Sequence, residues 1–492
     1  MKKMNLLVMS LVSAAALSFS SCSSNDDLTG GGTQSQADGV YMTLKISGTT
    51  SHGTRTGVKT PNTTENGTPD ESTITQGMLY IYDGQTCVFR KVITSEMFET
   101  KPSQTVAGKT KPIKVAVTGA IKTNKDYYVY FLANNTTVTD PLAATSIFTS
   151  TTGGTDLATA QNFVMFNQND GTNAAAHSTV KFTDDNKSSD NPAPAGEIKL
   201  DRVVARIDNP LFAETAKVVD DAAAGTTKNV ADVLASFDYV GYAASNLNNN
   251  SYVMQNWDDK FTTLNVKWGE TSKYFQPKDE FGTLYKGENL GKFNENNTYA
   301  FENTTNDVNE ATAVYFKIKA NLKEAAKTTA DFNDGTFYRY DGRLYTSIQA
   351  IYDDAATGAI SNPFTETGGI AAADVVNKIK DATTGKLTED EAKLAEFRET
   401  YKIEVYREGM MYYRWAISDM AYKPFVESET THTYSVLRNS IYRLNVTKIN
   451  EIGKDVPNGP EPDDPIKNPN FYMNVTVSIN PWVLNTKDIE LK

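Results

Sequence analysis

Apolar and polar residues alternate near the C-terminal end of the chain. The apolar positions are Phe471, Met473, Val475, Val477 and Ile479, with less apolar residues between them. Successive side chains of a β-strand point to opposite faces, so this pattern predicts a strand with one apolar face. After Pro481, Trp482 and Leu484 continue the apolar character. These seven apolar residues are the positions expected on a donor strand, which would leave its own subunit and pair with another.

A second alternating segment lies near the N-terminal end. Its apolar positions are Val40, Met42, Leu44 and Ile46. Residues 48–57 follow as a loop of small polar residues that contains Arg55, and proteases reach such loops. We hypothesise that an arginine-specific protease cuts between Arg55 and Thr56 and frees the preceding strand. The groove left behind would accept the C-terminal strand of another subunit, as in β-strand addition.

The rest of the chain also favours strands. It contains 25 Tyr and 22 Phe, and its short alternating runs are separated by Gly, Asn, Asp and Thr, a pattern typical of a β-sandwich. Strands are expected over residues 78–82, 88–93, 113–118, 127–133, 163–166, 197–207, 237–242, 252–254, 299–302, 313–322, 344–351, 403–406, 411–417 and 440–449. Two helices are expected, over 371–380 and over 388–398, the second capped by Thr388.

Changes in composition divide the chain. A polar stretch rich in Ala and Asp follows Asp208-Asn209-Pro210, and five prolines occur between Lys454 and Pro469. Such a proline-rich segment prefers extended conformations and can span several tens of ångströms at about 3.1 Å per residue. We expect a signal peptide (1–21), a propeptide with the first strand (22–55), an N-terminal sandwich (56–210), a C-terminal sandwich (211–453), and an arm with the donor strands (454–492).

The first residues are typical of an export signal. Lys2 and Lys3 precede a short apolar core, which ends at Phe19-Ser20-Ser21-Cys22. Small residues directly before a cysteine indicate bacterial lipoprotein processing, with Cys22 as the lipidated residue. Plain secretion with a coincidental cysteine is the alternative. Cys87 is the only other cysteine, so no intrachain disulfide is expected after processing.

Charge and residue supply argue against several functions. The net charge is −12 and no basic cluster occurs, which argues against nucleic acid as a partner. His52, His177 and His432 are the only histidines and stand far apart, so no metal site or Ser-His-Asp arrangement is expected. No local carboxylate pattern supports a glycosidase. We expect neither an enzyme nor a cofactor.

A few short motifs each have a structural alternative that we prefer. Gly108-Lys109-Thr110 lacks the upstream glycine of a phosphate loop, so a turn between strands is expected there. Residues 331–335 lack the closing glutamate of a calcium loop, and a hairpin turn is preferred. Tyr412, Tyr413 and Trp415 fit a core better than a sugar site. Arg202 and Arg206 are expected to pair with carboxylates near the domain boundary.

Several segments together carry a family resemblance. They are Arg202-Val203-Val204-Ala205-Arg206, Arg438-Asn439-Ser440-Ile441-Tyr442 with Val446, Lys448, Ile452 and Gly453, then Tyr472-Met473, Pro481-Trp482 and Asp488-Ile489-Glu490. In this combination the chain resembles the fimbrillins of type V pili in the Bacteroidales, most closely the Mfa-type minor-fimbrium shaft subunits. The departures are Phe19 and polar insertions over 61–70 and 353–366.

The resemblance implies an all-β protein of two transthyretin-like β-sandwich domains with small helical insertions. It also implies lipoprotein export to the outer membrane, protease cleavage and head-to-tail assembly of identical subunits into a surface fimbrium. Further partners would be accessory tip and anchor subunits, an arginine-specific protease, and receptors on host or bacterial surfaces. A tip or accessory adhesin of the same fimbria is the alternative function. A carbohydrate-binding or hydrolytic surface lipoprotein is a more distant third class.

Overall fold

The computed structural model describes most of the chain between residues 39 and 481. The described ranges are 39–48, 67–101, 108–116, 120–143, 145–169, 177–219, 227–255, 293, 295–305, 311–364, 369–417, 434–456 and 473–481. Some predicted functional residues lie outside these ranges, namely Cys22, Arg55, Thr56, Phe471, Trp482 and Leu484. Within the ranges, no helix combines the length and apolar character needed to cross a membrane.

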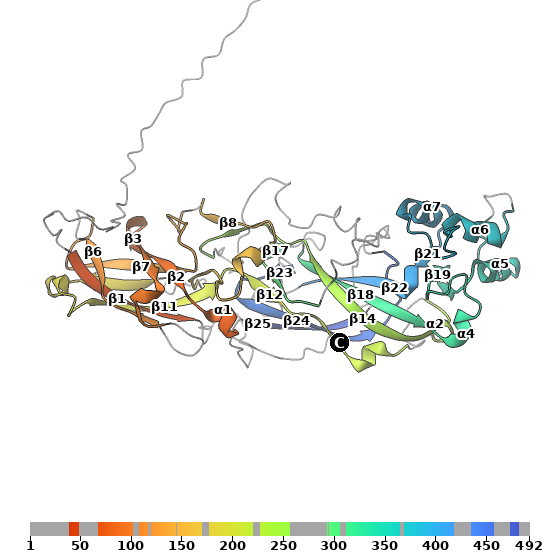
Figure 1. The fold of residues 1–492 in the computed structure, drawn as a ribbon, viewed down its shortest axis with the longest axis horizontal. Coiled ribbons are helices and arrows are strands. Elements are labelled where there is room, and N and C mark those ends of the chain that lie inside the picture. Colours follow the sequence, from red (N-terminus) through yellow and green to blue (C-terminus); the bar gives the residue numbers. More distant parts are fainter. Residues whose placement is uncertain are drawn as a thin grey trace, which may run out of the picture.

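The first sheet contains ten strands and lies at one end of the elongated molecule (Figure 1). Its strands are β1 (Gly39–Gly48), β2 (Gln76–Asp83), β3 (Thr86–Thr94), β4 (Phe98–Thr100), β5 (Gly108–Thr110), β6 (Ile113–Ala116), β7 (Lys125–Ala133), β9 (Met165–Asn167), β10 (Ser178–Phe182) and β11 (Ala193–Arg202). Their order is β3-β2-β7-β9-β11-β1-β5-β4, with β10 beside β7 and β6 beside β1. The short helix α1 (Pro69–Ser72) precedes β2.

The first sheet surrounds a single apolar core. It contains side chains from β1, β2, β7, β10 and β11, so strands far apart in the order meet in the same cluster. This requires the sheet to fold over itself in the manner of a sandwich. The β2–β3 hairpin turns at Asp83-Gly84, where Gly84 has φ +58°, a conformation that glycine adopts without strain.

Two further sheets form a second sandwich. The second sheet has the order β13-β24-β12-β16 with β25 beside β24, and the third sheet has the order β14-β18-β22. Their strands are β12 (Ala205–Ile207), β13 (Leu211–Phe212), β16 (Thr298–Ala300), β24 (Ser440–Ile449), β25 (Met473–Pro481), β14 (Leu234–Ser245), β18 (Ala313–Leu322) and β22 (Met410–Ala416). Both sheets contribute side chains to one core, which includes Leu444 of β24 and Phe316 of β18. The two sheets therefore pack face to face.

A helical insertion separates β18 from β22, two strands that are direct neighbours in the third sheet. It contains α4 (Glu324–Lys327), β19 (Phe337–Tyr340), β20 (Arg343–Tyr345), α5 (Ile348–Ala356), α6 (Ala372–Ile379), α7 (Glu391–Tyr401) and β21 (Glu404–Tyr406). Its helices and small sheet bury their own apolar cluster. The insertion lies at the end of the molecule opposite the first sheet (Figure 1).

The remaining elements are short. They are α2 (Val230–Val233), β8 (Ile147–Thr149), β15 (Asn250–Tyr252), β17 (Asn303–Thr305), β23 (Tyr434–Val436) and the 3₁₀ turns η1 (Ser95–Met97), η2 (Thr155–Leu157), η3 (Asp184–Lys187), η4 (Glu214–Lys217) and η10 (Arg407–Gly409). β8 pairs with β15, and β17 pairs with β23. The predicted class, an all-β protein with sandwich-like sheets and small helical insertions, is confirmed. The predicted division at residue 210 stays a prediction.

Local predictions were right for some elements and wrong for others. β18 and β24 have the predicted limits. The strand predicted over 344–351 is wrong, because β20 ends at Tyr345 and α5 begins at Ile348. The Ser347 hydroxyl caps α5 by accepting a hydrogen bond from the N–H of Ala350. The cap predicted at Thr388 is also wrong, since Asp390 caps α7.

Two other predictions need correction. Residues 108–110 form strand β5 and not a turn. The strand predicted over 197–207 is divided into β11 and β12, which belong to different sheets. The interruption at Val203-Val204 carries the chain from the first sheet to the second. A period-two pattern does not reveal such a crossing, because the apolar residues on both sides remain buried.

Candidate functional site

The strand predicted to be displaced, β1, has neighbours on both edges. It runs parallel to β11, with Met42 opposite Ala193 and Gly48 opposite Leu200. On its other edge it runs antiparallel to β6 and β5. In the described part of the first sheet, β4, β5 and β6 reach the other strands only through β1. Removing β1 would therefore expose two unpaired strand edges at once.

The apolar face of β1 lies in the core. Val40, Met42, Leu44 and Ile46 are each 0% exposed. Burying one such side chain contributes about 1.5 to 3 kcal/mol relative to leaving it in water. All four residues belong to the cluster that fills the first sheet. The groove left by β1 would thus be lined by apolar side chains and would expose unpaired backbone N–H and C=O groups.

Polar contacts fix the register of β1 at an irregular point. The pairing with β11 shifts register between Thr43 and Lys45. There the N–H of Leu44 donates a 2.9 Å hydrogen bond to the hydroxyl of Thr110 on β5. Lys45 forms a 2.8 Å ion pair with Glu197 on β11. Hydrogen bonds from Lys45 and Ser47 lower the pKa of Glu197.

The predicted donor strand is present as β25 and pairs with β24. The register places Val475 opposite Val446, Val477 opposite Leu444 and Ile479 opposite Tyr442. Residues directly opposite each other in an antiparallel pair share a face. Leu444, Val446 and Tyr442 are fully buried, so alternate residues of β25 stand in register with buried positions of β24. Among the described strands, β25 pairs with β24 alone, which makes it an edge strand.

A buried ionic network joins the two sandwiches. Arg206 on β12 forms ion pairs with Glu71 of α1 at 2.6 Å and with Asp208 at 2.5 Å. Asp208 also pairs with Arg443 of β24 at 2.7 Å. The hydroxyl of Tyr299 on β16 donates to Glu71 at 3.2 Å. The predicted pairing of Arg206 with carboxylates is confirmed, and it connects α1 to the second sheet.

Arg202 is held differently from Arg206. Its described contacts are hydrogen bonds to the backbone carbonyl of Glu71 and the hydroxyl of Ser72, both 2.8 Å, and to the side-chain oxygen of Asn439 at 3.3 Å. Burial lowers the pKa of Arg202 to about 10, so the guanidinium stays charged at neutral pH. These neutral oxygens help to satisfy the buried cation.

Burial and charge act in opposite directions on Glu71. Burial disfavours its charged form, but Arg206 and the N–H of Thr68 more than compensate, so its pKa is lowered from the usual 4.5. Thr68 donates to the Glu71 carboxylate at 2.7 Å. The carboxylate is thus ionised and has partners on both sides of the junction.

A second buried pair lies close to the start of β24. Arg438 pairs with Glu302 at 2.8 Å and donates to the carbonyls of Val253 and Tyr252 and to the hydroxyl of Ser251. This arginine therefore links the turn before β24 to strand β15. Since β15 pairs with β8, the link extends toward the first half of the chain.

The sequence interpretation missed most of these junction residues. Glu71 carried a recognisable signal, because Thr68-Pro69-Asp70-Glu71 has the spacing of a helix N-terminal capping box with proline at the first helical position. Asp208, Asn439 and Arg443 have no comparable local signal. Which residues they contact between the first sandwich and the second is decided by the fold.

The remaining predicted residues have structural roles. Tyr412, Tyr413 and Trp415 are buried, as expected for core packing. The hairpin turn predicted over 331–335 is wrong, because these residues lie between α4 and β19. The carboxylate of Asp331 instead accepts from the N–H of Ile348, the first residue of α5. The described ranges hold no group of three or more His, Cys, Asp or Glu residues that could bind a metal. His52 and His432 lie outside these ranges.

Comparison with known proteins gives one family match. Residues 404–488 match the family described as major fimbrial subunit protein type IV, fimbrillin, C-terminal. The resemblance to fimbrillins predicted from the sequence is thus confirmed over this part of the chain, and the match supports a fimbrial subunit. A search of curated proteins found no match.

Several solved structures are similar to this chain at low identity. A candidate cell adhesion protein from Parabacteroides distasonis is 11% identical with a TM-score of 0.44, covering 91% of this chain and 100% of its own. A fimbrilin from Porphyromonas gingivalis is 14% identical with a TM-score of 0.42, covering 92% and 99%. A C-terminally truncated tip fimbrial protein from Porphyromonas gingivalis is 11% identical with a TM-score of 0.30, covering 90% and 100%. Because these TM-scores are low, the functional interpretation rests on the family match and on the geometry of β1 and β25.

Proposed function

We propose that this chain is a structural shaft subunit of a bacterial surface fimbria, and that its subunits join by exchange of β-strands. The observation that carries the proposal is the position of β1. It is fully buried on its apolar face and paired on both edges, and it precedes the segment that contains Arg55 in the sequence. Cutting the chain after Arg55 would break the covalent link between β1 and the remainder of the subunit.

The proposed exchange needs an incoming strand with a matching pattern. β25 has apolar positions at every second residue, as β1 does. It is bound to its own subunit along a single edge, whereas β1 is bound along two. A strand that leaves a one-sided ladder for a two-sided groove gains backbone hydrogen bonds and apolar burial. This difference would favour assembly over the isolated subunit once the groove is open.

The alternative is a tip or accessory adhesin of the same fimbria. A tip subunit must accept a strand but has no need to donate one. The strict alternation of β25 and the proline-rich segment before it are the features of a donor, so they favour the shaft. The fimbrillin match supports a role in assembly over an enzymatic one.

Export and assembly complete the proposal. Cys22 would carry lipid that anchors the precursor to the outer membrane, and an arginine-specific protease would act at the surface. Identical subunits would then join head to tail, together with accessory tip and anchor subunits, and the finished fimbria would attach to host or bacterial receptors.

The test is to compare Arg55→Ala with the matched control Lys59→Ala, which removes a neighbouring basic residue of the same segment. We expect Arg55→Ala to reach the surface but stay monomeric, and Lys59→Ala to form fibres. N-terminal sequencing of wild-type fibre subunits should begin at Thr56. Fibres from Arg55→Ala, or wild-type fibre subunits that retain residues 40–46, would show that the proposed exchange is wrong.

A further inference from the structure

Residues 451–456, which begin two positions after the end of β24, lie outside the long strands, yet all of them except the half-buried Lys454 are buried. Glu451, Ile452, Asp455 and Val456 expose 2%, 1%, 7% and 6% of their surface. We name residues 451–456 the arm root, because the proline-rich segment continues from them. Buried backbone outside a ladder needs other hydrogen-bond partners. Those partners identify what holds the arm root in place.

Two tyrosine hydroxyls hold the backbone of the arm root. Tyr413 donates to the carbonyl of Glu451 at 2.8 Å and accepts from the N–H of Gly453 at 3.0 Å. Tyr406 donates to the carbonyl of Gly453 at 2.8 Å. Burial raises the pKa of Tyr406 well above its usual value, so the hydroxyl keeps the proton that it donates. Both sides of the Gly453 backbone are therefore satisfied by side chains.

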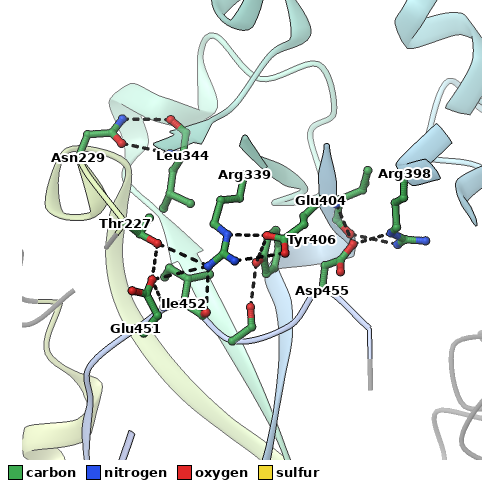
Figure 2. A network of polar contacts seen from close by, with 12 residues as sticks. Thr227, Asn229, Arg339, Leu344, Arg398, Glu404, Tyr406, Glu451, Ile452 and Asp455 are labelled. Carbon is green, nitrogen blue, oxygen red and sulfur yellow. Dashed lines mark hydrogen bonds and ion pairs between the residues drawn. The ribbon is translucent and has the colours of Figure 1, made fainter. Parts of the chain in front are cut away.

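Arg339 on β19 connects the arm root to the small sheet (Figure 2). Its guanidinium pairs with Glu404 at 2.5 Å, lies 3.6 Å from the carboxylate of Glu451 and donates to the carbonyl of Ile452 at 3.3 Å. Burial alone would lower the pKa of Arg339, but the carboxylates of Glu404 and Glu451 raise it above its usual value. The Arg339 guanidinium therefore stays charged and contacts both the insertion and the arm root.

The last part of the arm root is fixed through Asp455. Its carboxylate accepts from Arg398 of α7 and from the N–H of Val405 at 2.9 Å (Figure 2). Beside it, Lys454 and Tyr412 exchange two backbone hydrogen bonds of 2.8 and 2.9 Å. The arm root therefore lies between strand β22 and the insertion, and it is bonded to both.

Most of the side chains that hold the arm root come from the helical insertion, which gives the insertion a role. Arg339, Arg398 and Tyr406 all belong to residues 323–409, which separate the adjacent strands β18 and β22. A short hairpin turn is enough to join two neighbouring antiparallel strands. The insertion adds its own apolar core and presents two arginines and a tyrosine to the arm root.

The register of β25 shows where the arm root stands relative to the donor strand. β25 begins with Met473 opposite Ile449, the last residue of β24. The arm root begins only two residues later in the chain, at Glu451. Once β25 has separated from β24 to pair with another subunit, tension on the arm acts directly on the chain at the end of β24.

From these contacts we propose that the insertion, residues 323–409, clamps the arm root and makes it the fixed attachment point of the donor arm. The inference rests on the proposed function, because it assigns β25 the role of donor. Without the clamp, tension on the arm would open the β24 ladder one hydrogen bond at a time from Ile449. With the clamp, tension must break several buried hydrogen bonds and ion pairs together, and β24 stays paired.

The test replaces Asp455 by Asn, which keeps the shape and removes the charge that Arg398 faces. The matched control is Glu391→Gln in α7, the helix that also carries Arg398. It removes the charge from the 2.8 Å pair between Glu391 and Arg407 of η10 and does not alter the described contacts of the arm root. Hydrogen–deuterium exchange of the full chain is measured over 451–456. We expect exchange at least about tenfold faster in Asp455→Asn, since a buried charge loses its partner, and unchanged exchange in Glu391→Gln.

Fibres give a second readout. Asp455→Asn subunits should assemble but separate at lower urea concentration than wild-type fibres, while Glu391→Gln fibres match the wild type. Unchanged exchange in Asp455→Asn, or equal acceleration in both variants, would overturn the clamp. If wild-type protein forms no fibres, the proposed function fails, and the exchange measurement still decides whether the insertion fixes the arm root.

Discussion

The side-chain amide of Asn439 donates a 2.7 Å hydrogen bond to the carboxylate of Asp201, 238 positions away in the chain. Both residues are buried. Asp201 lies near the end of β11, which borders β1, and Asn439 immediately precedes β24, which holds β25. The contact therefore links the strand beside the proposed groove with the strand beside the proposed donor.

The first prediction concerns this contact. Asn439 has φ +54°, a left-handed conformation that asparagine and glycine tolerate better than alanine. Asn439→Gly should lower the free energy of unfolding by about 1 to 3 kcal/mol, because the buried Asp201 loses this donor. Asn439→Ala should cost about 1 kcal/mol more, since it adds backbone strain. Urea denaturation measures both. Equal stability of the two variants would mean that the backbone conformation relaxes.

The second prediction is a pH dependence that originates at Glu71. Its folded-state pKa lies below the usual 4.5, so the folded state binds fewer protons than the unfolded state in this window. The stability it contributes is complete above pH 4.5 and is lost as the pH falls through the lowered pKa. Glu71→Gln should therefore show a shallower loss of stability below that pH than the wild type.

Glu71→Gln should also be less stable than the wild type at pH 7, by about 3 kcal/mol, because Arg206 keeps only one of its two carboxylates. Urea denaturation between pH 3 and pH 7 measures both effects. Glu214→Gln, which breaks the exposed pair with Lys217, should stay within about 0.5 kcal/mol of the wild type. Parallel curves for the wild type and Glu71→Gln would contradict the lowered pKa.

Local patterns predicted the long strands well, because their signal is contained within the strand. The limits of β18 and β24 follow from continuous runs of apolar and β-branched residues. The same reasoning fails at α5, because Ile348 and Ile351 share one helical face, although the pattern of residues 344–351 predicts a strand. Ser347 was the signal for a helix, since serine is a favoured cap.

The junction and the arm root could not be predicted from the sequence, for a physical reason. Arg206 stands 135 positions from Glu71, and Arg398 stands 57 positions from Asp455. Charged residues were available everywhere in the chain, and only the packed sheets decide which of them meet. The proline composition placed the start of the arm at Lys454, yet Lys454 pairs with Tyr412 in the body of the protein.

The third prediction separates the two faces of β25. Val477 lies opposite the buried Leu444, whereas Thr476 lies opposite Asn445, which is partly exposed. Because the side-chain period of a strand is two, an incoming β25 that buries its apolar face in a groove must leave Thr476 on the other face. Burying an aspartate without a partner is costly, so Val477→Asp should weaken fibres far more than Thr476→Asp.

The measurement is the urea concentration at which preformed fibres release subunits, with the free energy of unfolding of each monomer determined in parallel. Val477→Asp fibres should release subunits at a markedly lower concentration, while Thr476→Asp fibres stay close to the wild type. The monomer values separate a weakened joint from a weakened subunit, since β25 also pairs with its own β24. Equal effects of the two aspartates on the fibres would mean that β25 does not insert with its apolar face inward.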